Sequence, residues 1–355
     1  LAWPVARPAP PPQPPDYSAQ QGYQLTGPSG MGVRSVWPLP GGTGGGQVPG
    51  GGGLGIQICD VEYSFQAGHV DLPTVTTLAS PPGETPFDPF ANTDHGTAVL
   101  GAIFARSNGN GVTGGAHGAQ AFFSFARTSA GYNPAAAISR ALNALGNGDL
   151  LLIEQQAFGP NSLPCCSLGG CPPGTDCQTG LAPSEWDFSV YNAIRFVVAM
   201  GITVVEAAGN GSQNLDDPAF AAMHAPFLAA NDSGAILVGA AAVPGGSTTD
   251  RSRLSFSNYG STVDLQGWGE LVTTLGYGDL HSAGGANEFC TGVFAGTSSA
   301  SALVVAAAAQ LQSVHRATTG HPLAPATLRE LLRATGAAQT SGVNPASQNI
   351  GPRPN

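Results

Sequence analysis

Three side chains of this chain could together catalyse acyl transfer: Asp60, His95 and Ser298. That chemistry needs a nucleophile, a base that takes its proton, a carboxylate that orients the base, and donors for the oxyanion. Asp60 closes the apolar run GIQIC, His95 opens the helical pattern DHGTAVLGAIFA, and Ser298 opens the helical pattern GTSSASALVVAAAA. A helix N-terminus offers free N–H groups that stabilise negative charge beside Ser298. The sequence therefore predicts a catalytic triad of these three residues.

The elements that must position the triad alternate between apolar strands and helical patterns. We expect helices over 95–105, 134–145, 188–199 and 325–333 and one from Ser298, with strands ending at Asp60 and in the runs AQAFFSFAR, LLLIE, ITVVEAA, AILVGAAAV and LVTT. Near-continuous apolar strands separated by helices are typical of a parallel sheet. The expected fold class is α/β, with a parallel β-sheet covered by helices on both faces.

Domain organisation follows from composition along the chain. Residues 1–16 are Pro-rich and predict an extended linker, and residues 17–355 predict one catalytic domain with a Cys-rich insertion at 161–183. The insertion carries four cysteines without a histidine and without paired CxxC spacing, which favours disulfides over zinc: Cys165, Cys166, Cys171 and Cys177. Disulfides imply an oxidising compartment. Cys59 and Cys290 stay unassigned and could be ordinary buried thiols.

Charge and hydropathy exclude some partners. The 355 residues carry a net charge of −10 and no lysine, which argues against nucleic acid. The longest apolar run, 302–309, is far shorter than the roughly 18 residues of a membrane span, so we expect a soluble protein. No signal pattern follows Leu1, so we expect any targeting segment or pro-segment to lie outside this sequence.

The chain order Asp, His, Ser within DHGTAVLG and GTSSAS resembles the subtilisin family, the subtilases. GHVDL at Gly68, SNGNGVTGGA at Ser107, VVEAAGNG at Val204 and SFSNYGSTVDLQGWGE at Ser255 extend the resemblance over nearly the whole chain. It implies a subtilisin-like fold and a secreted, monomeric serine endopeptidase that acts on polypeptides and loses an N-terminal pro-segment on maturation.

The resemblance also assigns roles to residues. Ser298 is the expected nucleophile, His95 the general base and then acid, Asp60 the orienting carboxylate, and Asn210 in AAGNG the oxyanion donor. One departure concerns the segment after the family's catalytic Asp, usually Asp-Ser/Thr-Gly, which is here Asp60-Val61-Glu62. Two others follow the nucleophile, where Ser299 and Ala302 replace a common Met and a usual Pro.

Substrate and metal sites are further expectations from the resemblance. One cleft segment is expected near 121–127, and the first specificity pocket is expected between two walls made of Gln156, Ala157, Phe158 and Gly159 on one side and Ala208 and Gly209 on the other. A structural Ca²⁺ site is expected from one carboxylate and a polar loop, at Asp71, Arg106, Asn108, Asn110 and Val112. The alternative for this loop is an Asn/Gly turn that holds its shape without metal.

Three other functions are weighed against the peptidase. A sedolisin-like acid peptidase would use Glu as its base, and DHGT argues against it. An α/β-hydrolase esterase would need G-x-S-x-G and another triad order. A catalytically silent binding protein on the same scaffold would usually have lost a triad residue, whereas all four catalytic positions are filled here.

Two glutamates interrupt apolar strands: Glu154 in LLLIE and Glu206 in ITVVEAAGN. An ionised carboxylate buried alone is costly, so such a group protonates or finds a partner. Because the two strands should be neighbours, we expect the two carboxyls to meet beneath the first pocket and share one proton. The alternative is that each accepts hydrogen bonds from nearby backbone or from Gln155 and Gln156.

Overall fold

The central feature of the computed structural model is a parallel sheet of seven strands, which confirms the expected α/β class. The structure describes residues 13–45, 55–162 and 178–355. In spatial order the strands are β11 (Leu265–Trp268), β10 (Ile236–Ala241), β9 (Thr203–Ala207), β6 (Leu150–Ile153), β1 (Gln57–Glu62), β3 (Gln120–Phe125) and β2 (Val75–Thr77). The middle strand β1 pairs in parallel with β6 on one side and with β3 on the other.

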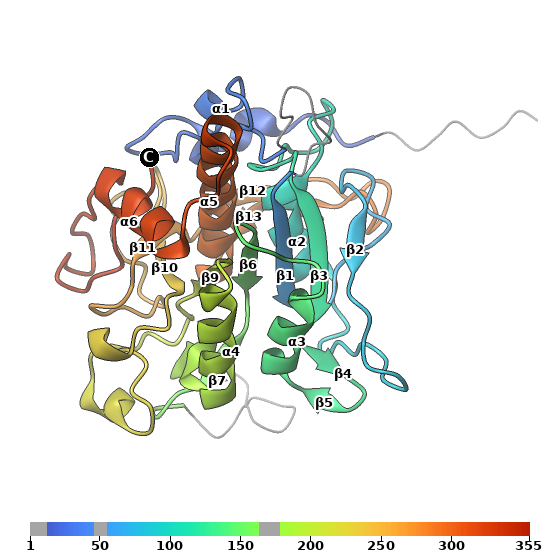
Figure 1. Cartoon of the computed structure of the whole chain (residues 1–355). Coiled ribbons are helices and arrows are strands. Elements are labelled where there is room, and N and C mark those ends of the chain that lie inside the picture. The colour runs from blue at the N-terminus through green and yellow to red at the C-terminus, as the bar shows by residue number, and fades with distance from the viewer. Residues whose placement is uncertain (1–12, 46–54, 163–177) are drawn as a thin grey trace, which may run out of the picture.

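Helices cover both faces of this sheet, as expected (Figure 1). The described helices are α1 (Val33–Val36), α2 (Asp94–Phe104), α3 (Pro134–Ala141), α4 (Phe188–Ala199), α5 (Thr297–Thr319) and α6 (Pro325–Thr335). Side chains alternate along β1: Ile58 packs with the cluster that contains α2 and α5, whereas Cys59 and Val61 pack with α3 and α4. Short 3₁₀ helices lie at Ser18–Gln20, Gly22–Gln24, Ser184–Trp186, Pro218–Ala221 and Ala229–Asn231.

Two expected elements differ from the structure. The helix expected over 134–145 ends at Ala141. The run LVTT lies in β12 (Val272–Leu275), which pairs antiparallel with β13 (Cys290–Phe294) outside the large sheet. Residues 269–271 alone link β11 to β12, and a parallel neighbour needs a crossover of a dozen residues or more. Two further antiparallel pairs are β4 (Arg127–Thr128) with β5 (Gly131–Tyr132) and β7 (Gln156–Phe158) with β8 (Leu181–Pro183).

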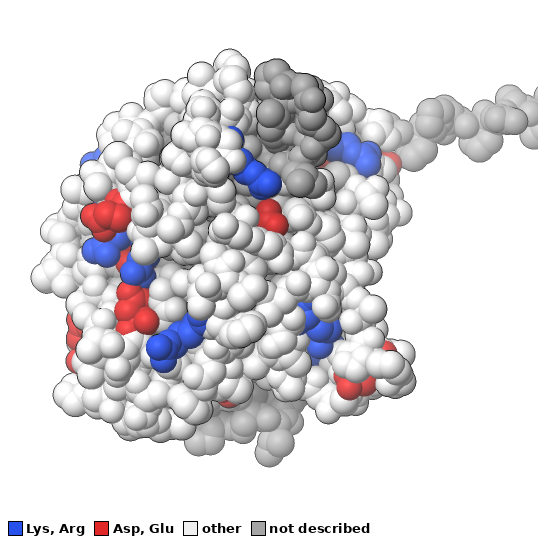
Figure 2. Space-filling view, viewed as in Figure 1, with Lys and Arg blue, Asp and Glu red and all other residues white. Residues whose placement is uncertain are grey.

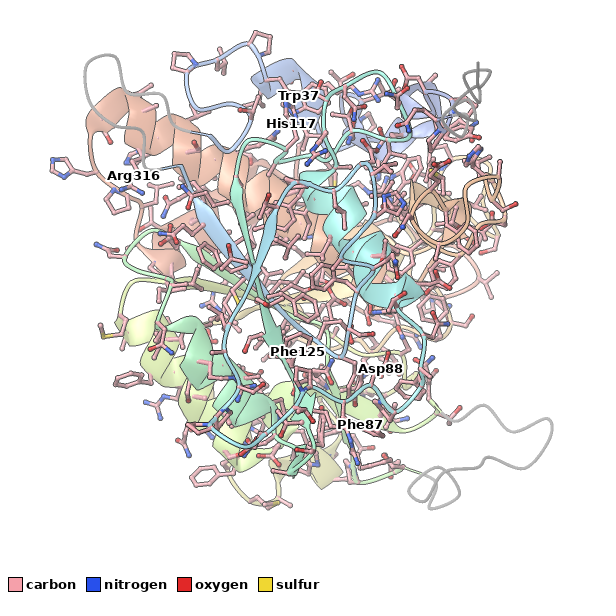
Figure 3. The ribbon with its side chains drawn as sticks, turned by 90° about the vertical axis from the view of Figure 1, so that its right-hand side faces the viewer. Trp37, Phe87, Asp88, His117, Phe125 and Arg316 are labelled. Atoms are coloured by element: carbon pink, nitrogen blue, oxygen red, sulfur yellow. The ribbon has the colours of Figure 1, made fainter. Side chains whose placement is uncertain are left out.

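The two ends of the sheet differ in their surroundings (Figure 3). Trp37 and His117 lie together at the amino end, with ring centroids 4.9 Å apart. Phe125, the last residue of β3, lies at the carboxyl end on the same side as Asp88. In parallel α/β sheets, ligands bind outside the carboxyl ends of the strands, so this end is where a site is expected.

Charged side chains are sparse on the molecular face in Figure 2, where small blue and red groups stand apart in a largely uncharged surface. Within the described part of the chain, no helix combines the length and apolar character needed to cross a bilayer.

Candidate active site

His95 is positioned by the start of α2 and by the end of β1. Its Nδ1 lies 2.8 Å from Oε2 of Glu62, the last residue of β1, and 38% of its side chain stays exposed. Burial alone lowers the pKa of His95, but the Glu62 carboxylate, reinforced by Glu154 and Asp88, raises it above the ordinary value. The other Glu62 oxygen accepts hydrogen bonds from the backbone N–H of Tyr63 and from Gln155. The imidazole is thus held in one orientation by a carboxylate.

Asp60 does not make the expected contact with His95. Its carboxyl group is fully buried, and neither oxygen has a hydrogen-bond partner in the described structure. Burial, followed by the neighbouring Glu62 and Glu154 carboxylates, raises the pKa of Asp60 well above its ordinary value. The prediction that Asp60 orients His95 is therefore wrong, because Glu62 occupies that position.

The sequence contains a signal that distinguishes the two carboxylates. Alternate residues of a strand point to one face, so Asp60 and Glu62 both face α2 and α5. At about 3.3 Å per residue, Glu62 lies about 7 Å nearer the carboxyl end of the sheet. Glu can also replace Asp as the orienting carboxylate of a triad. The segment Asp60-Val61-Glu62 thus carries two acids on one face, and Glu62 is the one nearer the carboxyl end of the sheet.

Ser298 lies at the N-terminus of α5, as expected, and is nearly buried at 6% exposure. Gly296, just before the helix, has φ +112°, a conformation that favours glycine. Glu154 lies by the first turn of α5, where its Oε1 accepts a hydrogen bond from Ser301 Oγ at 2.6 Å; burial raises its pKa, and His95 and the Ser298 hydroxyl lower it. Glu154 is therefore a shared neighbour of Ser298 and His95 at the carboxyl end of the sheet.

Asn210 follows β9 and is fixed by the residue before Ser298. Its Oδ1 accepts hydrogen bonds from both the backbone N–H and the hydroxyl of Thr297, each at 2.9 Å. This leaves the Nδ2 group as the donor, and it bonds Oε1 of Gln178 at 2.7 Å. Gln156 supports the arrangement, because its Oε1 accepts from the Asn210 backbone at 2.7 Å and its Nε2 lies 3.3 Å from Gln178 Oε1. The Nδ2 donor of Asn210 is therefore already hydrogen-bonded, to the side-chain oxygen of Gln178.

The expected pocket walls lie next to one another and share a neighbour, strand β8 from the end of the insertion. β8 pairs with Gln156, Ala157 and Phe158 in β7. The side chain of Asn258 donates to Ala208 O and Leu181 O, so the same strand also borders the second wall. A Cβ on Gly209 would lie 2.7 Å from Asn258 Nδ2 and one on Gly159 2.6 Å from Gly180 O, which explains the glycines. The remaining insertion residues 163–177, with their four cysteines, lie outside the described residues.

The second expected cleft segment, 121–127, is mostly a central strand. Ala121, Phe123 and Ser124 are buried in β3, and only Arg127 reaches the β4–β5 hairpin beyond it. The hairpin residue Tyr132 directs its hydroxyl toward Gln156 O at 3.5 Å. The part of the chain that approaches Gln156 is therefore the hairpin that follows residues 121–126, not those residues themselves.

The loop predicted to bind calcium gathers around Asp71. One Asp71 oxygen accepts from Asn108 Nδ2 at 2.8 Å and the other from the backbone N–H of Val112 at 3.0 Å. Arg106 contributes a backbone N–H to Asp71 O, and Asn110 bonds Asn108 within the loop. Burial raises the pKa of Asp71 to about 6, although these bonds lower it. The carboxylate and the loop are in contact as expected, and calcium itself stays a prediction.

Glu154 and Glu206 do not form the expected pair. In the parallel register Ile153 is opposite Glu206, so Glu154, one residue later, points to the other face of the sheet. Glu206 instead neighbours Glu185, whose backbone N–H donates to Glu206 Oε1 at 2.9 Å. Burial, then the Glu185 carboxyl, raises the pKa of Glu206 well above its ordinary value. The proton-sharing partner expected for Glu206 is thus on another element.

Two cysteines lie outside the insertion and within the described residues. Cys59 and Cys290 are both buried and free, which is the alternative that the sequence left open.

Known proteins resemble this chain in sequence and in fold. A family model described as "Subtilase family" matches residues 78–351, which leaves β1 outside the match. An "Extracellular protease" of Xanthomonas campestris pv. campestris is 31% identical over 246 residues, 69% of this chain and 36% of that protein. The chain thus spans about a third of that relative's length.

Three solved structures share the fold at low sequence identity. A protease of Pseudoalteromonas arctica PAMC 21717 has a TM-score of 0.58 at 16% identity, covering 96% of each chain. A lanthipeptide protease has a TM-score of 0.56 at 17% identity, covering 81% of each chain. The prenylagaramide maturation protease PagA has a TM-score of 0.54 at 16% identity, covering 86% of this chain and 88% of its own.

Proposed function

Because this chain belongs to the subtilase family, we propose that it is a serine endopeptidase whose triad is Ser298, His95 and Glu62. The observation that carries this proposal is the 2.8 Å contact between His95 and Glu62 at the end of the sheet where Ser298 begins α5. Labelling by a fluorophosphonate tests it. The reagent should modify Ser298 in the parent chain and leave the Ser298→Ala variant unmodified, whereas a catalytically silent scaffold would not react.

The reaction proceeds by acyl transfer. Ser298 Oγ attacks the carbonyl carbon of the peptide bond while His95 Nε2 takes the hydroxyl proton, and Glu62 stabilises the resulting imidazolium through Nδ1–H. The oxyanion accepts hydrogen bonds from Asn210 Nδ2 and from the backbone N–H of Ser298. The intermediate collapses as His95 returns the proton to the leaving amine. Water, activated by the same His95, then releases the acid product and restores Ser298.

Polypeptides are the substrates that this site would accept. We propose that an extended peptide adds as a strand along the edge of β7 that β8 leaves open, so main-chain hydrogen bonds give affinity. The side chain before the scissile bond then lies between Gln156–Gly159 and Ala208–Gly209. Secretion is supported by the name of the Xanthomonas relative, an extracellular protease, and the disulfides expected in the insertion agree with it. Removal of a pro-segment and a monomeric state stay proposals.

The contact between Gln178 and Asn210 predicts an effect on turnover. Because the substrate oxyanion must replace Gln178 Oε1 on Asn210 Nδ2, we expect Gln178→Ala to raise kcat/KM on a peptide amide by up to about fivefold, the equivalent of one hydrogen bond of about 1 kcal/mol. The matched variant Gln178→Glu should lower kcat/KM, because a charged oxygen bonds the donor more strongly. A lower kcat/KM in Gln178→Ala would instead show that Gln178 helps to bind substrate.

Calcium binding is tested by thermal unfolding. The donor set of a buried carboxylate, an Asn amide and backbone carbonyls suits Ca²⁺, and binding requires the ionised form of Asp71. We therefore expect saturating Ca²⁺ to raise Tm by several degrees relative to a chelator above about pH 6, with a smaller effect below it. Asp71→Asn should abolish the difference. Equal melting in calcium and in chelator at pH 8 would show that the loop holds without metal.

A further inference from the structure

Glu154 is a buried acid of the active site to which the proposed triad gives no role. It follows β6 directly, is 5% exposed, and reaches under the first turn of α5. Its Oε1 accepts a hydrogen bond from Ser301 Oγ at 2.6 Å, and the same Ser301 hydroxyl lies 3.0 Å from the backbone oxygen of Ser298. Its Oε2 is buried without a partner in the described structure. One carboxyl group is therefore linked, through Ser301, to the first turn of the helix that carries the nucleophile.

The charges around this carboxyl come from several elements. Asp60 and Glu62 face it from β1, and His95 faces it from α2, with Asp88 acting on His95 from the loop before that helix. Burial raises the pKa of Glu154 to about 7, against the opposing effects of His95 and the two serines. Glu154 therefore changes charge in the pH range where a catalytic histidine loses its proton.

Resting on the proposed function, we propose that Glu154 is a positioning residue that holds Ser298 and sets the pH range in which His95 acts as a base. As a carboxylate it accepts the hydrogen bond of Ser301, which fixes the start of α5, and with it Ser298, relative to the sheet. The same negative charge adds to that of Glu62 and favours the imidazolium form of His95. Because the charge of each group shifts the pKa of the other, the acidic limb of activity depends on both Glu154 and His95.

The direction in which the acidic limb shifts follows from the negative charge of Glu154. Glu154→Gln keeps the size and the capacity to accept hydrogen bonds but removes the negative charge beside His95. The neutral form of His95 then persists to lower pH, so the acidic limb of kcat/KM should move down by about 0.5 to 1 pH unit. In Glu154→Gln the acidic limb of kcat/KM should also fit a single ionisation, that of His95. Ser301→Ala, which removes a bond that favours the carboxylate, should move the limb in the same direction by a smaller amount.

The experiment measures two pH profiles in parallel: kcat/KM on a neutral peptide, and the rate of Ser298 labelling by an uncharged fluorophosphonate. The matched control is Asp60→Asn, which removes a buried carboxyl from the same face of β1 that is not among the groups with the largest effects on the pKa of His95. A downward shift of both profiles in Glu154→Gln and Ser301→Ala, with Asp60→Asn unmoved, supports the proposal. Lower activity with unmoved limbs would show a purely structural role and overturn it. Absence of Ser298 labelling in the parent would instead overturn the proposed function.

Discussion

Ser298→Ala is expected to lower kcat on peptide substrates by about 10⁶-fold, the scale known for loss of the nucleophilic serine in subtilisin. The variant loses the atom that forms the acyl-enzyme but keeps the Asn210 amide held by Thr297. Residual hydrolysis should therefore remain about 10³-fold or more above the reaction in water. The measurement is steady-state hydrolysis of a peptide amide, with circular dichroism to verify the fold.

The neighbouring serine supplies the control for that variant. Ser299 is fully buried, and its hydroxyl lies within hydrogen-bond distance of Trp268 O at 2.8 Å and of Gly296 O at 2.9 Å. Ser299→Ala should cost about 1 kcal/mol of folding free energy and little activity. Turnover in Ser298→Ala that matches Ser299→Ala would remove Ser298 from the mechanism.

Glu62→Gln is expected to lower kcat by about 10⁴-fold, as loss of the orienting carboxylate does in serine peptidases. A glutamine amide can donate to His95 Nδ1, which favours the tautomer with hydrogen on Nε2, and that nitrogen can then no longer accept the Ser298 proton. The amide also cannot stabilise the imidazolium. The measurement is kcat from pH 6 to 10 on the same substrate.

Asp60→Asn provides the contrast, because its kcat should stay close to that of the parent. Its stability should also change with pH in a defined direction. Burial raises the pKa of Asp60 in the folded protein well above its value in the unfolded chain, where Asp ionises at about pH 3.9. Above that pH, ionisation favours unfolding of the parent, so Asp60→Asn should unfold at a higher Tm at pH 8 than the parent. A large loss of kcat in Asp60→Asn with an active Glu62→Gln would restore Asp60 to the triad.

Much of the fold could be predicted from the sequence because it follows from local patterns. The apolar runs of 4–6 residues between helical patterns predicted a parallel sheet covered on both faces, and the structure confirms it. The starts of α2 and α5 within one or two residues of His95 and Ser298 follow from side-chain periodicity. The position of LVTT was wrong because the linker before β12 is too short for a crossover, a limit that the apolar pattern does not express.

The site was determined by the sequence only in part. DHGT, GTSS and AAGN indicated which His, Ser and Asn lie at element ends, and the structure brings these ends to one edge of the sheet. For the carboxylate the sequence offered two candidates on one face of a strand, and the tertiary structure selected between them. Asp60 and Glu62 share a face of β1, and the distance to the start of α2 leaves Glu62 in contact with His95 and Asp60 buried below it.

Contacts between distant segments were decided by register and by connection. Glu154 and Glu206 lie in adjacent strands, but the pairing of Ile153 with Glu206 sends the two carboxyls to opposite faces. Glu154 consequently reaches Ser301 in α5, 147 positions away in sequence. Gln178 reaches Asn210 because β8 pairs with β7. A one-residue change of register would reverse these faces, and no local pattern in the sequence specifies that register.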